Sequence, residues 1–150
     1  MQITSRFTIA VHIITCIDYL RDGDPVTSKV LAGSVGVNPV IIRTVIGKLK
    51  EAGIVSISQG KSGIALGRPL DQITFYDIYR AVDCVDETGL FHFHENPNPE
   101  CPVGRTIHIA ADRRLAAVQQ AMEDEMKSIT LADVAADARK AMEQVQAERS

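Results

Sequence analysis

VNPVIIRTVIGKLKEAG, residues 37–53, is the segment from which the architecture of this chain is most readily inferred. Asn38 is a preferred helix-capping residue, and it directly precedes a proline at the first helical position, where the missing amide has no helical partner to lose. Gly53 supplies the left-handed conformation that commonly ends a helix. The apolar residues expected to face inward between these signals are Ile41, Ile42, Val45, Ile46 and Leu49. The segment therefore predicts an amphipathic helix.

A shorter helix is predicted immediately before this one. Thr27 is a suitable N-cap, and Gly36 can end a helix that runs through Val35. Two helices joined by a tight glycine-containing turn form a helix-turn-helix, whose second helix can enter the major groove of DNA. Farther along, IVSIS (residues 54–58) and IALG (residues 64–67) flank QGKSG, which predicts two strands and a tight turn. A helix-turn-helix followed by such a hairpin is a winged helix.

More helices are predicted around this unit. Apolar residues at helical spacing indicate helices over 5–20, 74–82 and about 102–128, and the last of these would be about 40 Å long. Its apolar stripe consists of Val103, Ile107, Ala111, Leu115, Val118 and Met122. A helix of that length extends beyond a small domain, so the stripe is expected to pack against a partner subunit. Thr130 and Asp133 have the spacing of a capping box and predict one more helix. The expected fold is mainly α with a small β-hairpin wing.

The composition limits the class of protein. A chain of 150 residues that is 45% apolar can form one ordinary core. The net charge of -3 and the pI near 5.8 give no general attraction to nucleic acid, so DNA binding would need a local basic patch. The apolar N-terminal segment carries Arg6, His12 and Asp18, which favours an amphipathic helix over a signal peptide. We therefore expect a cytoplasmic protein with no membrane partner.

The cysteines do not form a recognisable framework. Cys16, Cys84 and Cys101 are widely spaced and contain no CxxC pair, so neither a disulfide scaffold nor a zinc ribbon is indicated. Histidines and acidic residues near Cys101 allow a cysteine-histidine nucleophile as an alternative. Because the chain lacks a catalytic signature and a glycine-rich phosphate loop, we do not expect an enzyme.

Five segments follow one another in a characteristic order: SRFTIAVHI, VNPVIIRTVIGKLKEAGIVSISQGKSG, RPLDQITFYDIYRAVD, ECPVGRTIH and SITLAD. Their order and spacing resemble the Rrf2 family of bacterial winged-helix transcription regulators, which includes an iron-sulfur cluster regulator and a cysteine-metabolism repressor. The resemblance implies a homodimer that binds a palindromic operator in double-stranded DNA and usually represses. It also implies a DNA-binding domain over 1–83, a sensor-type connecting loop over 84–101, and a dimerisation helix and C-terminal helix over 102–150.

The second helix of the helix-turn-helix is the expected recognition helix. When its apolar residues face inward, Val40, Arg43, Thr44, Gly47 and Lys48 remain on the outward face. Arg43 is expected to bond a guanine edge through two donors, and Val40 to touch a thymine methyl group. The full set of predicted DNA-binding residues is Arg6, Thr27, Ser28, Asn38, Pro39, Val40, Arg43, Thr44, Lys48, Gln59, Lys61 and Ser62.

Other members of this set would contact the DNA backbone. The amides at the helix start, positioned with Asn38, suit a phosphate. The wing tip would reach the minor groove or adjacent phosphates with Lys61 as its cation, although relatives often carry an arginine where this chain has Gln59. Arg6 and Lys29 are either phosphate contacts or solubilising charges. A winged helix that has lost DNA binding is the alternative for the whole unit.

The connecting segment FHFHENPNPECPVGRTIH, residues 91–108, is rich in potential ligands. Iron-sulfur members of the family carry three cysteines in this loop, whereas this chain carries one, Cys101, so neither a cluster nor another cofactor is expected. A divalent metal held by Cys101 with His94 or His108 is an alternative.

Cys101 is also a candidate redox switch. It directly precedes Pro102, so its sulfur should lie at the positive end of a long helix, with Arg105 one turn away. Both features favour the reactive thiolate. Modification there would add bulk at the joint between the DNA-binding unit and the dimerisation helix. The alternative is that Cys101 only caps the helix.

Overall fold

The structure of the chain, a computed structural model, describes residues 3–58, 63–83 and 89–150. Its elements are, in order, α1 (Ser5–Leu20), α2 (Ser28–Val35), α3 (Pro39–Glu51), β1 (Val55–Ile57), β2 (Ile64–Leu66), η1 (Leu70–Gln72), α4 (Phe75–Ala81), α5 (Pro102–Ser128) and α6 (Leu131–Arg149). The predicted helices and the two antiparallel strands are confirmed, and the 3-10 turn η1 was not predicted.

Local sequence signals set the helix boundaries. The side chain of Asn38 accepts a hydrogen bond from the Val40 amide at 2.8 Å and so caps α3. Gly36 ends α2 with a φ of 80°, which is in the left-handed region that glycine adopts without strain. Thr130 and Asp133 form the predicted capping box at the start of α6.

The core is built around α1, which contacts α2, α3, α4, α6 and β2. The largest fully buried side chains are Ile13, Ile14, Ile17, Leu31, Ile42, Val45, Leu49, Ile54, Ile73, Ile78, Val82 and Leu131. The prediction that Ile41 faces inward was wrong, because this residue is 43% exposed. Ile42 and Leu49 lie near the middle of the buried stripe of α3 and Val45 lies at its edge, whereas Ile41 is about 100° around the helix from Ile42, beyond Val45. The recognition helix therefore carries an extra apolar residue on its surface.

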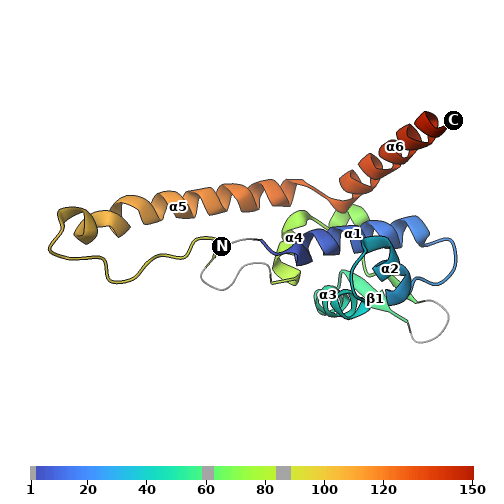
Figure 1. Cartoon of the computed structure of the whole chain (residues 1–150), viewed down its shortest axis with the longest axis horizontal. Coiled ribbons are helices and arrows are strands. Elements are labelled where there is room, and N and C mark those ends of the chain that lie inside the picture. The colour runs from blue at the N-terminus through green and yellow to red at the C-terminus, as the bar shows by residue number, and fades with distance from the viewer. Residues whose placement is uncertain (1–2, 59–62, 84–88) are drawn as a thin grey trace.

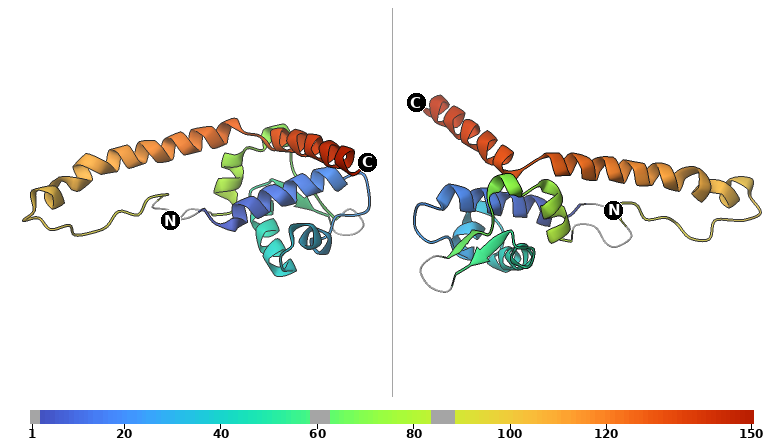
Figure 2. Two further views of the ribbon diagram at one scale, coloured as in Figure 1. Left: turned by 45° about the horizontal axis from the view of Figure 1, so that its top comes forward. Right: turned by 180° about the vertical axis from the view of Figure 1, so that it is seen from behind.

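The long helix α5 extends away from the winged-helix unit (Figure 1). Within this single chain none of its residues is fully buried, and Val103 and Val118 of the predicted stripe are mostly exposed. Met122 and Met126, near its C-terminal end, pack against the core. The connection over 89–101 runs outward alongside the helix to its distant N-terminal end, and α5 then returns to the winged-helix unit (Figure 2).

The joint between α5 and α6 is tied to the segment that begins α4. The Phe75 amide donates to the Ile129 carbonyl at 2.9 Å, and the Leu131 amide donates to the Ile73 carbonyl at 2.8 Å. Leu131 itself is fully buried in the core. The two C-terminal helices are thus anchored on the winged-helix unit where they meet. Over the described parts of the chain, no single helix has the length and hydropathy to cross a membrane.

Candidate nucleic-acid interface and cysteine site

The exposed face of α3 contains the central predicted DNA contacts. Val40, Arg43 and Thr44 are all exposed, and Val40 is 61% accessible. The Thr44 hydroxyl donates to the Val40 carbonyl at 3.0 Å. Its proton is therefore used within the helix, while its oxygen can still accept a hydrogen bond from a base or a water molecule. The face thus offers one guanidinium, one acceptor and an apolar surface that Ile41 enlarges.

The start of α3 offers fewer free amides than the sequence suggested. Pro39 has no amide proton, the Val40 amide donates to Asn38 Oδ1, and the Ile41 amide donates to the Asn38 carbonyl at 3.0 Å. At the start of α2, Thr27 Oγ1 likewise accepts from the Val30 amide at 3.2 Å. These caps stabilise the two helices. Phosphate contacts by Thr27, Ser28, Asn38 and Pro39 remain predictions.

Lys48 is not a free cation on the face of α3. Its Nζ lies 2.7 Å from Oδ2 of Asp83, which follows the end of α4. No local sequence pattern indicates this pair, since 35 positions separate the two residues. Their contact depends on how α4 packs beside α3. Of the other predicted cations, Arg6 and Lys29 are exposed near the starts of α1 and α2.

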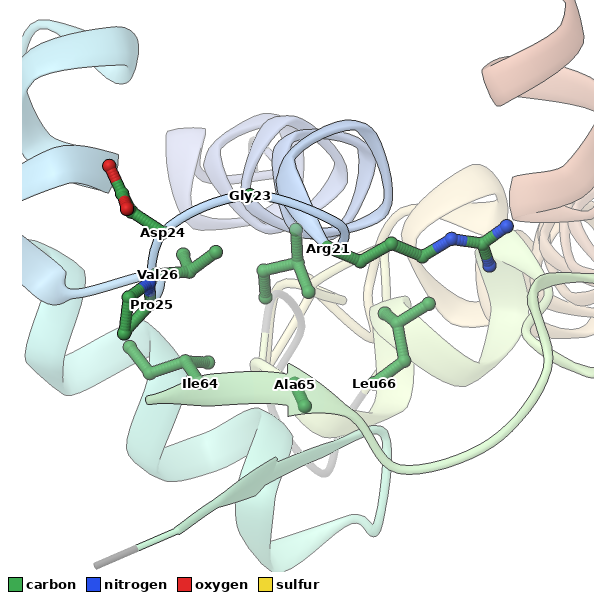
Figure 3. A pocket seen from close by; sticks show the side chains of 9 residues that line it. Arg21, Gly23, Asp24, Pro25, Val26, Ile64, Ala65 and Leu66 are labelled. Carbon is green, nitrogen blue, oxygen red and sulfur yellow. The ribbon is translucent and has the colours of Figure 1, made fainter. Parts of the chain in front are cut away.

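The wing is joined to the loop between α1 and α2. The Ile64 amide donates to the Val26 carbonyl at 2.9 Å, and Val26 forms a parallel bridge with Gly63. A cavity of about 720 Å³ lies between this loop and β2, with Arg21 and Leu66 at one side (Figure 3). The predicted wing contacts Gln59, Lys61 and Ser62 lie outside the described residues.

Cys101 is exposed and occupies the N-cap position of α5, as predicted. Its thiol forms no cap hydrogen bond of ordinary geometry. Nevertheless, the backbone amides of Gly104 and Val103 lower the pKa of the Cys101 thiol, because they stabilise the negative sulfur. The lowering comes from these amides and not from the Arg105 guanidinium that the sequence suggested. The other two cysteines are not part of this site: Cys16 is half-buried in α1, and Cys84 lies outside the described residues.

The histidines of the connecting segment have structural partners. His108 Nδ1 lies 3.0 Å from Oδ2 of Asp112, one turn later on α5, a pair that the i, i+4 spacing could have revealed. The rings of His94 and Phe93 lie against the His108 ring, with centroid distances of 5.2 and 6.4 Å. These contacts hold the segment against α5.

The described residues do not fit an iron-sulfur cluster. Cluster iron is held by several cysteine thiolates, and the described part of the connecting segment supplies only Cys101. Over 3–58, 63–83 and 89–150, no group of three or more histidine, cysteine or acidic side chains is arranged to hold a metal ion. The divalent site suggested for Cys101 with His94 or His108 therefore lacks a third ligand among these residues.

Together, the packed helices α1, α2 and α3, the antiparallel hairpin and the exposed outward face of α3 define a winged helix-turn-helix protein. The model of the Rrf2 family, described as iron-dependent transcriptional regulators, matches residues 3–137. The chain belongs to this family, so its class is that of a transcriptional regulator and not of an enzyme.

Individual relatives agree with this assignment. The Bacillus subtilis protein YwnA, named as an HTH-type transcriptional regulator, is 41% identical over 133 residues, which cover 89% of this chain and 96% of YwnA. A crystal structure described as that of a DNA-binding protein is 35% identical, with a TM-score of 0.69, and the match covers 87% of this chain and 98% of that one. A Lactobacillus plantarum structure described as a transcriptional regulator has 25% identity and a TM-score of 0.73, and the match covers 97% of each chain.

Proposed function

We propose that this protein is a cytoplasmic, sequence-specific regulator that binds a palindromic operator as a homodimer and represses transcription. The observation that carries the proposal is the outward face of α3, where Val40, Arg43 and Thr44 are exposed together on a helix whose other side is fixed in the core. Arginine can bond a guanine edge through two donors, and valine can touch a thymine methyl group. A Cβ at Gly47 would meet open space, so packing within the protein does not require glycine at this position. The glycine instead allows the helix backbone to approach the DNA groove closely.

The proposed homodimer rests on the exposed stripe of α5. Residues 102–150 would form the dimerisation part of the chain, and residues 1–83 the DNA-binding part. Val118 is 54% exposed in the single chain, although it lies on an apolar stripe. Burying such a stripe against a second α5 would remove apolar surface from water and place two copies of α3 on one duplex.

Sedimentation analysis tests this interface. Val118→Asp should shift the protein from dimer to monomer, because it places a charge in the proposed interface. Ala116→Asp is the matched control, since it adds the same charge to an exposed position on another face of α5. A protein that is monomeric without any substitution, or equal behaviour of the two variants, would reject the α5 interface.

Cys101 is proposed to make DNA binding responsive to oxidants or electrophiles. The support is its exposure, its lowered pKa and its place at the start of the proposed dimerisation helix. Added bulk there would alter the entry into α5 and could change the spacing of the two recognition helices.

Selection of genomic fragments by the purified protein tests the function as a whole. One sample is left reduced and the other is treated with a thiol oxidant before selection. The reduced protein should enrich fragments that share a palindromic site, and oxidation should change their recovery. Salt-sensitive binding without any shared site would contradict sequence-specific regulation. Equal recovery of fragments after oxidation would leave the proposed regulator intact but would rule out the redox switch at Cys101.

A further inference from the structure

Asp83 places a carboxylate beside the recognition helix. Its Oδ2 lies 2.7 Å from Lys48 Nζ, close enough for a charge-assisted hydrogen bond. The Lys48 side chain is 29% exposed and that of Asp83 is 65% exposed, so the pair lies at the surface. Exposed pairs of this kind contribute little to folding stability. The Lys48–Asp83 pair should therefore affect the binding of charged ligands to α3 more than it affects folding stability.

The core holds Asp83 in place independently of Lys48. The preceding residue, Val82, is fully buried, and its amide donates to the Ile78 carbonyl at 3.0 Å. Asp83 then adopts a φ of 51°, in the left-handed region that aspartate and asparagine tolerate better than most residues. The carboxylate is thus presented to α3 by the turn that follows the buried Val82.

Lys48 lies one turn beyond Thr44, on the flank of the face proposed to meet DNA. There its ammonium group would be a ligand for a backbone phosphate. A phosphate oxygen and the Asp83 carboxylate compete for the same ammonium group, and the carboxylate also repels a phosphate that comes near it. Pairing with Asp83 therefore keeps Lys48 from contacting a DNA phosphate at this flank.

We infer that Asp83 is an intramolecular competitor for DNA phosphate at Lys48 and weakens binding to all DNA sequences alike. The inference rests on the proposed function, since it assumes that α3 meets DNA. The competition concerns a phosphate, which every sequence presents, so the preference for the operator over other sequences should not change. Asp83 would thereby limit non-specific retention of the protein on DNA.

Fluorescence anisotropy with operator and scrambled duplexes over a range of salt concentrations tests the inference. Asp83→Asn should bind both duplexes about fivefold more tightly at low salt, because Lys48 becomes available to phosphate. The slope of log K against log salt should become steeper by about 0.9, the value expected for one additional phosphate contact. Asn is suited to this turn because it also tolerates the left-handed region. Asp71→Asn is the control, because it removes the same charge from an exposed position on η1, which packs on α6.

A second pair of variants separates direct competition from a general charge effect. In a Lys48→Met background, Asp83→Asn should change affinity by less than twofold, because the contested cation is gone. Any of three results would overturn the competition. These are an equal gain in affinity from Asp83→Asn with and without Lys48, a gain in affinity matched by Asp71→Asn, and a loss of affinity in Asp83→Asn. If the unsubstituted protein shows no salt-sensitive binding to either duplex, the proposed function fails and the inference fails with it.

Discussion

Arg139 on α6 places its Nη2 3.0 Å from Oδ2 of Asp18 on α1. Asp18 is the one buried charged residue among those described, with a side chain only 4% exposed. Arg21 approaches the other carboxylate oxygen at 3.5 Å. The last helix is therefore joined to the central helix of the core by an ion pair as well as by apolar packing at Leu131.

Removal of this guanidinium should loosen α6. Arg139→Ala leaves Asp18 buried with only the longer Arg21 contact, and we expect the free energy of unfolding to fall by about 2 kcal/mol, less than for a fully buried pair because Arg139 is mostly exposed. Urea denaturation measures the change. Lys140→Ala, at the neighbouring exposed position, should have little effect. Equal unfolding midpoints for the two variants would show that the ion pair does not secure α6.

The attachment of the wing depends on Gly63. Its φ is 65°, and a Cβ at this position would lie 2.4 Å from the Val26 carbonyl oxygen. Gly63→Ala should therefore separate β2 from the α1–α2 loop and reduce stability by about 1 to 3 kcal/mol, as measured by thermal unfolding. Gly33→Ala in α2 is the contrasting variant, because its Cβ would meet open space and alanine favours the helix. A Gly63→Ala protein as stable as the parent would contradict this account of the wing.

Cys101 should react as a thiolate at lower pH in the folded chain than in the unfolded chain. The Gly104 and Val103 amides lower its folded pKa below the ordinary value of 9.0. Folding thus favours the thiolate, and the resulting stability is present above the unfolded pKa and is lost as the pH falls through the folded pKa. Alkylation rates of the Cys101 peptide, measured by mass spectrometry between pH 5 and 10 in buffer and in urea, test the direction. A native midpoint at or above the midpoint in urea would contradict it.

Thymine methyl groups should contribute to operator affinity through Val40 and Ile41, the two exposed aliphatic residues at the start of α3. Replacing an operator thymine by deoxyuridine removes only the methyl group. At a contacted position, affinity should fall by roughly fourfold, the value of one buried methyl-sized group. The same replacement should lower the affinity of a Val40→Ala, Ile41→Ala double variant by a smaller factor. Insensitivity of the unsubstituted protein to every such replacement would exclude methyl readout.

Most elements of the fold could be predicted because their signals are local. Asn38-Pro39, Gly36 and the Thr130 box fix helix ends through contacts within a few residues, and the structure confirms them. The apolar spacing in α5 also predicted a helix that the winged-helix unit leaves largely exposed. These features require no knowledge of how distant segments pack.

Features that depend on packing could not be predicted in the same way. Whether Ile41 lies inside or outside depends on where the edge of the buried stripe falls, and a one-dimensional pattern leaves that edge undefined. The contact of Lys48 with Asp83 requires the packing of α4 beside α3 and a left-handed turn at a residue that is not glycine. Likewise, the sequence placed Cys101 at the positive end of a helix, where the amides lower its pKa, but it also suggested an effect of Arg105 that is not among the causes of the lowered pKa.

The central claim is that the outward face of α3 reads DNA sequence, and Arg43→Ala tests it most directly. Gel-shift titration should compare this variant with Arg113→Ala, which removes another exposed arginine, on α5. Against the selected operator, Arg43→Ala should lose about 1 to 3 kcal/mol of binding free energy and much of its preference over scrambled DNA, whereas Arg113→Ala should bind like the parent. Unchanged operator affinity and preference in the folded Arg43→Ala protein would contradict the account.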